Sequence, residues 1–317
     1  MTAPLVELVG LQKYFPAKEG ILKAVDGVSL QIHQGETLGL VGESGCGKST
    51  TGKLLVRLLD PTAGQIRYRG RDITSLKTPE ESRKFSRTVQ MVFQDPYSSL
   101  DPRMSVGEII EEPLRVHRLF PARRERQQRI RQLMDYAGIA GRLINSYPHE
   151  LDGGRRQRVG IARALALDPE FLVLDEPVSA LDVSIQAQII NLFQTLQQEL
   201  SLTYLFIAHD LSVVHHVSTR IAVMYMGEIV ETGSADEVIR DPRHPYTEAL
   251  VSAIPRVKNR GTRTRIILQG DVPTPVDPPP ICRFYGRCPK AMDQCRRPVE
   301  LLTSASNRPV RCIREEQ

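Results

Sequence analysis

A phosphate-binding loop between an apolar strand and a helix limits the fold of this chain more than any other sequence feature. Residues 38–41 read Leu-Gly-Leu-Val, and this apolar run predicts a buried strand. Gly42, four further residues, and then Gly47, Lys48 and Ser49 follow in the spacing of the P-loop pattern. A helix-like run begins at Lys48. A strand, loop and helix in this order favour a phosphate site over an ordinary Gly-rich loop.

The spacing follows from the chemistry of phosphate binding. Glycines let the backbone turn tightly and approach a phosphate with no Cβ in the way. Successive N–H groups at a helix N-terminus form a nest for anions. The Lys48 ammonium can reach the β- and γ-phosphates, and the Ser49 hydroxyl can hold Mg²⁺. The predicted nucleotide-binding loop comprises Gly42, Glu43, Ser44, Gly45, Cys46, Gly47, Lys48, Ser49 and Thr50.

A second apolar run ends in two acids. Residues 171–174 are followed by Asp175 and Glu176, which is the Walker-B arrangement. Asp175 would reach the Mg²⁺ coordination shell, and Glu176 could orient or deprotonate the attacking water. The alternative, two surface acids at a strand end, loses weight because a P-loop precedes them in the chain.

Polar side chains follow two more predicted strands. Gln94 comes after the run 88–93, and His209 comes after the run 203–207. The carboxyl ends of strands are where ligands bind in open α/β sheets. An imidazole at such an end is suited to contact a γ-phosphate, although His209 stands out by position only. By itself, a lone Gln such as Gln94 is more often a loop residue.

Helical periodicity replaces strand-like runs between about residues 95 and 166. Apolar residues within 122–137 recur at helical spacing opposite an Arg-rich face, which is most simply a solvated face. The Gly153-Gly154 pair precedes another helix and forms a second possible anion nest. Near the N-terminus, Tyr14 and Phe15 are expected in a loop between two strands, where either ring could stack on an adenine or cover the core edge.

Composition sets broad limits. The chain has 317 residues, enough for one large domain or a domain with an extension. Its 41% hydrophobic and 25% charged residues are ordinary for a soluble globular protein, and a net charge of +5 is too small to require a nucleic-acid partner. No apolar run approaches the ~20 residues that span a bilayer. No secretory signal is visible, so we expect cytosolic residence.

Taken together, these motifs resemble the nucleotide-binding subunit of an ABC transporter over essentially the whole chain. The resemblance is to the oligopeptide and dipeptide importer ATPases, because of three features: Lys13-Tyr14-Phe15-Pro16, the run 94–102, and His244-Pro245-Tyr246 before a Cys-containing tail. It identifies Gln94 as the Q-loop residue, 151–157 as the signature region, 179–182 as the D-loop and His209 as the switch histidine.

The resemblance implies an α/β fold. Its parts are a P-loop NTPase (RecA-like) core, an antiparallel β edge, an inserted helical subdomain and a small Cys-rich C-terminal extension. The expected domains are a nucleotide-binding domain over 1–254, a basic and then Pro-rich linker over 255–280, and the Cys-rich extension over 281–317.

The resemblance also implies roles for single residues. Glu176, His209 and Gln94 would be catalytic, and Ser49, Gln94 and Asp175 would hold Mg²⁺. Phe15, with Tyr14 second, would stack on the adenine of ATP.

The partners implied are a second ABC ATPase subunit, two transmembrane permease subunits and, indirectly, a substrate-binding protein. Two ATPase subunits would meet head to tail, with each ATP between one P-loop and the other chain's signature loop. The chain would then lie peripherally on the cytoplasmic face of the inner membrane.

The signature loop departs from the family pattern. Leu-Ser-Gly-Gly-Gln is replaced by Leu151-Asp152-Gly153-Gly154-Arg155. An ionised Asp152 can only accept hydrogen bonds and brings negative charge near a polyanion. We therefore predict a heterodimer with unequal ATP sites. In the alternative, Arg155 compensates and both sites hydrolyse.

Four of the five cysteines lie in the tail, at Cys282, Cys288, Cys295 and Cys312. Four thiolates suit a tetrahedral Zn²⁺ or an iron–sulfur cluster, and their spacing matches neither common pattern. Similar tails in peptide-importer ATPases imply a [4Fe–4S] cluster, which we favour over zinc or no metal.

The cargo stays open, since peptides, nickel and other small solutes are all moved by related importers. An alternative of another class is a soluble ABC ATPase that acts on nucleic acid. It would call for a long coiled coil, tandem cassettes or a strongly basic face, and none of these is evident. A third alternative, a subunit that binds ATP without hydrolysis, is opposed by Glu176 and His209.

Overall fold

The computed structural model describes residues 3–76, 78–254, 265–303 and 308–316. The chain divides into two compact units. The first, 1–74 with 206–317, contains the P-loop and the Cys-rich tail. The second, 75–205, contains the Walker-B strand and the region predicted as a helical insertion. None of the helices in the described part of the chain has the length and apolar character needed to span a bilayer.

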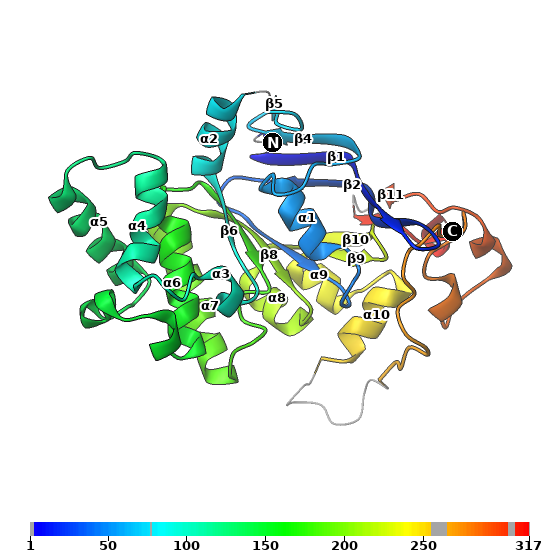
Figure 1. Ribbon diagram of the computed structural model, residues 1–317. Helices are drawn as coiled ribbons and strands as arrows, with labels where there is room; N and C mark the ends of the chain where they lie inside the picture. The colour runs from blue at the N-terminus through cyan, green and yellow to red at the C-terminus, as the bar shows by residue number, and fades with distance from the viewer. Residues whose placement is uncertain (1–2, 77, 255–264, 304–307, 317) are drawn as a thin grey trace. The chain divides into compact units, whose positions relative to one another are not determined.

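The first unit is built mainly of strands (Figure 1). Its elements are β1 (Val6–Ala17), β2 (Gly20–Ile32), β3 (Thr37–Val41), α1 (Lys48–Leu55), β4 (Ala63–Tyr68), β5 (Arg71–Asp72), α8 (Leu211–Val217), β9 (Arg220–Tyr225), β10 (Glu228–Ser234), α9 (Ala235–Arg240), α10 (Pro245–Ser252), β11 (Leu302–Thr303), β12 (Pro309–Val310) and the short 3-10 turns η3 (Tyr285–Arg287), η4 (Asp293–Arg296) and η5 (Ile313–Glu316).

An antiparallel sheet in the order β2-β1-β4-β5 carries the adenine candidates. Tyr14 and Phe15 were predicted in a loop, and this is wrong, because both lie within β1, paired with Lys23 and Leu22 of β2. Register shifts interrupt the β1–β2 pairing between residues 8 and 14. Such bulges break the alternation of apolar and polar residues by which a strand is recognised, so the sequence showed only the strand ends.

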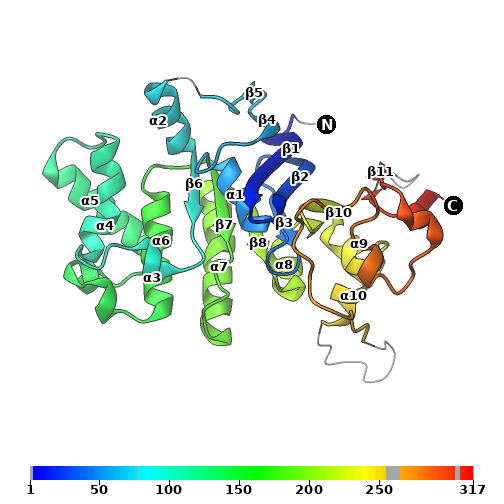
Figure 2. The same cartoon turned by 45° about the vertical axis from the view of Figure 1, so that its right-hand side comes forward.

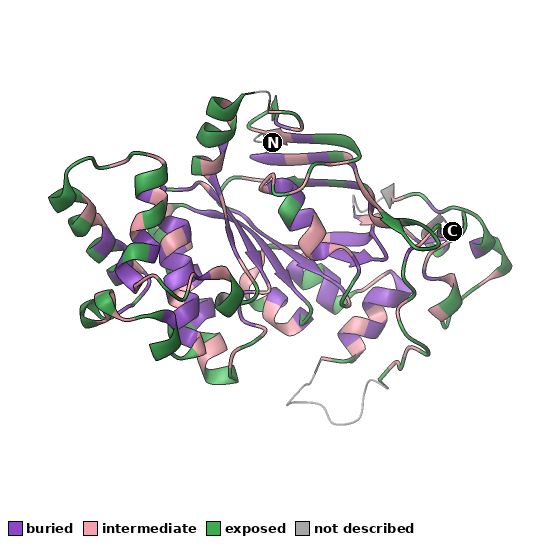
Figure 3. Cartoon of the chain, in the orientation of Figure 1, coloured by how far each residue is buried: buried purple, intermediate pink, exposed green. Residues whose placement is uncertain are grey.

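The other sheet of this unit runs β11-β12-β10-β9-β3. β3 pairs in parallel with β9, and both are almost wholly buried (purple in Figure 3). Buried parallel strands are apolar throughout, which is why 38–41 was recognisable in the sequence. β9 and β10 form an antiparallel hairpin that turns at Gly227. β12 of the tail extends the sheet by pairing with β10, where Glu231 lies opposite Val310.

Helix α1 ends at Leu55. Arg57 has a φ of 61°, and such a left-handed residue ends a helix. The Leu58 N–H then bonds to the Lys53 carbonyl at 2.9 Å, which closes the last turn.

The second unit contains one parallel strand pair, β6 (Val89–Val92) with β7 (Phe171–Asp175), among the strands assigned wholly to its described residues. Its helices are α2 (Pro79–Thr88), α3 (Pro96–Ser99), α4 (Val106–Val116), α5 (Arg123–Tyr136), α6 (Gly153–Leu165) and α7 (Val183–Leu200), with 3-10 turns η1 (Gly141–Asn145) and η2 (Pro148–Glu150). α4, α5 and α6 pack on one another. The helix expected over 122–137 is confirmed as α5. β8 (Thr203–Ala208) leads the chain back into the first unit.

The predicted basic linker falls mostly on residues 255–264, which lie outside the described residues. The Pro-rich stretch that follows is not wholly irregular, since Val276 forms a β-bridge with Leu22 of β2. The Lys23 N–H also donates to the Pro275 carbonyl at 2.9 Å. Figure 2 shows the tail running alongside β10 and α10. The tail is thus part of the first compact unit.

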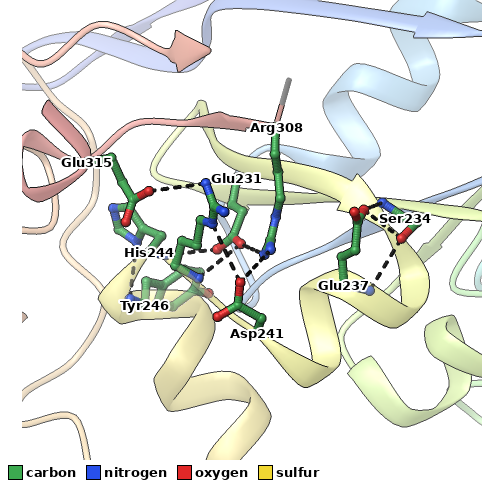
Figure 4. Close-up of polar contacts among 9 residues, drawn as sticks. Glu231, Ser234, Glu237, Asp241, His244, Tyr246, Arg308 and Glu315 are labelled. Atoms are coloured by element: carbon green, nitrogen blue, oxygen red, sulfur yellow. Dashed lines mark hydrogen bonds and ion pairs between the residues drawn. The ribbon is translucent and has the colours of Figure 1, made fainter. Parts of the chain in front are cut away.

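A buried ion pair attaches the end of the tail (Figure 4). Glu231 of β10 is 0% exposed and pairs with Arg308, which is 5% exposed. The same carboxylate accepts from the N–H groups of Arg243 at 3.1 Å and His244 at 2.9 Å. Arg308 also lies 3.4 Å from Asp241. Removing one member of a buried pair leaves the other charge uncompensated.

We expect Arg308→Ala to lower the free energy of unfolding by about 3 kcal/mol, because Glu231 would keep a buried charge without its cation. Urea denaturation of the full chain measures this. Arg240→Ala is the matched control, since Arg240 pairs with Asp236 at 3.5 Å on the surface and should change little. Equal losses of unfolding free energy in the two variants would show that the buried pair of Glu231 and Arg308 stabilises the fold no more than a surface pair does.

Candidate nucleotide-binding site

The P-loop requires its glycines for space and for backbone conformation. A Cβ on Gly42 would lie 2.2 Å from the Met224 carbonyl oxygen. Gly47 has a φ of +108°, and a Cβ there would lie 2.1 Å from the Ala24 carbonyl oxygen. Gly45 has a φ of +79° with nothing within 4 Å of its Cβ position. The loop is therefore packed tightly against β2 and β9 on one side and open at Gly45.

Lys48 stabilises the loop by hydrogen bonds to its backbone. Its Nζ donates to the carbonyl of Gly42 at 2.7 Å and to that of Glu43 at 3.0 Å, and the residue is 4% exposed. An ammonium held this way at the start of α1 is placed for phosphate oxygens. Burial raises the pKa of the adjacent Cys46 thiol, so Cys46 offers its backbone, not a thiolate, to a ligand.

The two aromatic candidates differ in their surroundings. The Tyr14 hydroxyl donates to Asp26 at 2.5 Å, and burial together with this hydrogen bond raises the pKa of Tyr14 to about 12. The Lys23 ammonium lies 5.5 Å from the Tyr14 ring centroid. Phe15 has no polar atom to satisfy and is half-buried. The choice of Phe15 over Tyr14 as the adenine-stacking residue stays a prediction.

In the second unit, two predicted catalytic residues meet. Gln94 Nε2 donates to Glu176 Oε2 at 2.9 Å. They follow β6 and β7, and the carboxyl ends of paired parallel strands share one edge of a sheet, which explains the contact. Asp175, the last residue of β7, is 4% exposed.

Backbone strain accompanies the Glu176 carboxylate. Its φ is 44°, in the left-handed region that costs a non-glycine residue about 1 kcal/mol or more. Ser179, the first residue of the predicted D-loop, donates its hydroxyl to the Glu176 carbonyl at 3.1 Å. Strain of this kind is typical of functional sites.

His209 lies in the first unit, exposed, directly after the wholly buried β8. The position expected from the sequence is therefore the one observed, at the carboxyl end of a strand. Asp210 follows as the N-cap of α8 and accepts from the Ser212 N–H at 2.7 Å.

The signature loop has a feature that sequence reasoning missed. Asp152 is the N-cap of α6, and its carboxylate accepts from the Arg155 N–H at 2.8 Å. Arg155 Nε lies 3.3 Å from the other carboxylate oxygen. Gly154 is required, because a Cβ there would meet Ile185 at 2.7 Å. An Asp immediately before a helix is an N-cap signal that could have been found in the sequence.

The four tail cysteines come together without a disulfide. Cys282 and Cys295 pack with Val299 and Ile313. Burial, assisted by the other three thiols, raises the pKa of Cys282 to about 11. Across the residues that the structure describes, however, no group of three or more His, Cys, Asp or Glu side chains is placed to hold a metal ion. The placement of the thiols does not support the predicted metal centre.

Comparisons with known proteins agree with the motifs. Residues 25–179 match the family model described as ABC transporter, and 230–295 match that for the C-terminal region of oligopeptide/dipeptide transporters. The chain is 49% identical over 304 residues to the oligopeptide transport ATP-binding protein AppF of Bacillus subtilis, covering 93% of this chain and 92% of that protein. It is 47% identical to Escherichia coli OppF, also an oligopeptide transport ATP-binding protein, over 98% and 96%. It is 47% identical to the dipeptide transport ATP-binding protein DppF of Haemophilus influenzae, over 92% and 91%.

Solved structures share the fold. The ATP-binding cassette MJ0796, solved as a dimer bound to ADP and Pi, superposes with a TM-score of 0.67 at 31% identity over 73% of this chain and 98% of that one. The cbiO1 protein of Clostridium perfringens, part of the ABC transporter complex cbiONQ, gives a TM-score of 0.66 at 26% identity over 76% and 92%.

Identity at this level over nearly the whole chain shows the family, and it confirms the resemblance drawn from the motifs. The P-loop and the Walker-B strand are the parts by which such proteins use ATP and Mg²⁺. The chain belongs to the ABC transporter family, among the ATP-binding subunits of oligopeptide and dipeptide transporters, and is an ATPase whose hydrolysis of ATP energises transport.

Proposed function

We propose that this chain powers a peptide importer from the cytoplasmic face of the membrane, together with a second ATPase subunit, two permease subunits and a substrate-binding protein. The observation that carries the proposal is the match of residues 230–295 to the C-terminal region of oligopeptide/dipeptide transporters. Oligopeptide and dipeptide relatives along almost the full chain support it. An importer of nickel or another small solute is the alternative.

The residues divide the chemistry of hydrolysis among them. Lys48 would pair with the β- and γ-phosphates, and His209 would contact the γ-phosphate. Ser49, Gln94 and Asp175 would provide oxygen ligands for Mg²⁺. Glu176 would accept the proton of the attacking water. Its hydrogen bond to Gln94, 2.9 Å long, holds the carboxylate in one orientation, which supports this role.

Hydrolysis by the assembled complex tests the function. We expect peptide-loaded binding protein to stimulate the ATPase rate, because closure on ATP is coupled to the permease. Glu176→Gln should lower the ATPase rate that this chain's own site contributes to the complex by about 10²-fold or more, because the amide cannot take a proton. ATP binding should persist. If peptide-loaded binding protein does not change the ATPase rate, the transported solute is not a peptide. If Glu176→Gln leaves the ATPase rate undiminished, this chain is a subunit that only binds ATP.

We propose further that the partner is a different ATPase chain and that the two ATP sites are unequal. Asp152 has no hydrogen to donate to a γ-phosphate, which supports a weaker signature loop. The ion pair of Asp152 with Arg155 supports the alternative, in which the guanidinium offsets the charge. Both side chains are more than half exposed, so this pair is screened by solvent.

Asp152→Ser combined with Arg155→Gln separates these two possibilities. Unequal sites predict a several-fold rise in the ATPase rate of the assembled complex, since the serine hydroxyl adds a donor. Serine is also a good N-cap, so α6 should be retained. The single variant Arg155→Gln, which leaves the Asp152 charge in place, is the control. An unchanged rate in the double variant would mean that both sites already hydrolyse.

For the tail we propose a metal centre held by the four thiols, a [4Fe–4S] cluster ahead of zinc. Cys282 and Cys295 share one small apolar core, and the other two thiols help to raise the pKa of Cys282, which supports the proposal, although the present placement of the thiols does not form a ligand set. Protein purified without oxygen should be brown, with absorbance at about 400 nm. Cys295→Ser should abolish the colour. A colourless preparation with one zinc per chain would identify the metal as zinc. A preparation with neither iron nor zinc would contradict the proposal of a metal centre.

A further inference from the structure

A seven-residue segment of the tail, Cys282–Cys288, contacts the P-loop directly. Arg287 donates to both carboxylate oxygens of Glu43, from Nη1 at 2.7 Å and from Nη2 at 3.1 Å. The two side chains are 8% and 29% exposed. A bidentate pair between a planar guanidinium and a carboxylate is the strongest form of this contact and fixes the orientation of both groups.

The backbone of the same glutamate is held from another side. The Tyr246 hydroxyl accepts from the Glu43 N–H at 2.8 Å, and Tyr246 is 0% exposed. The Glu43 carbonyl accepts from Lys48 at 3.0 Å. Glu43 therefore has a partner for its N–H, its carbonyl and its carboxylate, and two of the three partners lie far away in the sequence.

Tyr246 is itself fixed by an aromatic cluster. Phe284 of the tail, 2% exposed, has its ring 5.5 Å from that of Tyr246, 5.2 Å from that of Tyr225 and 5.6 Å from that of His244. The His244 Nδ1 accepts from the Tyr246 N–H at 3.1 Å, so this imidazole caps α10 (Figure 4). A buried tyrosine ring in such a cluster has little freedom to move its hydroxyl away from Glu43.

The other arginine of the segment anchors it to the strands beneath the loop. Arg283 pairs with Asp26, lies 3.3 Å from Glu228 and donates to the Met226 carbonyl. The next residue of that turn, Gly227, donates its N–H to the Cys46 carbonyl at 2.8 Å. The tail segment thus holds the P-loop at Glu43 and supports the turn that holds it at Cys46.

We infer that Arg287 and Tyr246 are positioning residues for ATP binding, which hold Glu43 so that the P-loop keeps its phosphate-binding shape. The N–H groups that a P-loop presents to phosphate cannot also bond within the protein, so the loop depends on contacts at its other atoms. A loop that is already ordered loses less conformational freedom on binding. The Cys-rich tail is by this inference a part of the nucleotide site.

The test compares ATP dissociation constants of full-length variants by titration calorimetry with Mg²⁺-ATP. Arg287→Ala should weaken binding about tenfold, since the bidentate contact is lost. Arg287→Lys should recover part of this affinity. Lys290→Ala is the matched control, because Lys290 joins the same tail to Glu248 of α10 without contacting the P-loop, and it should bind ATP normally.

Two further variants separate positioning from general stability. Glu43→Gln should weaken binding by a similar factor, and adding Arg287→Ala to it should cause little further loss, because both remove one contact. Tyr246→Phe, which keeps the ring, should weaken binding several-fold. Tyr204→Phe removes another buried hydroxyl, bonded to the Phe193 carbonyl at 3.0 Å, and should not. Wild-type affinity in Arg287→Ala, additive losses in the double variant, or an equal loss in Lys290→Ala would each overturn the inference.

Discussion

A loop that offers its N–H groups to a phosphate cannot use those groups to hold its own shape. In this protein the shape comes from contacts around the loop. Gly42 and Gly47 pack so closely on the carbonyls of Met224 and Ala24 that no Cβ fits. Lys48 joins two carbonyls of the loop from inside. Every other part of the nucleotide site depends on this loop, because it sets where a phosphate can lie.

The carboxylate that would activate water is held by comparable means in the second unit. The parallel pairing of β6 and β7 places Gln94 beside Glu176, and the hydrogen bond between them orients the acid. The left-handed backbone of Glu176 shows that its position is imposed against local preference. Rigid buried strands can impose such a conformation, whereas a mobile loop would relax.

The Cys-rich tail is packed into the first unit at several points and is not a separate appendage. β12 extends the sheet through β10, Arg308 pairs with buried Glu231, and Phe284 fills an aromatic cluster. The segment between Cys282 and Cys288 connects these anchors to Glu43 of the P-loop. Anything that reshapes the neighbourhood of these thiols therefore acts on residues that support nucleotide binding.

The sequence by itself determined the P-loop, the Walker-B acids and the family, because each depends on residues adjacent in the chain or on a fixed spacing. Only the tertiary structure decided that Tyr14 lies in a bulged strand and that Glu43 is held by Tyr246 and Arg287. The last contacts join positions 203 and 244 residues apart. No local pattern encodes such a pairing, since the fold alone brings the partners together.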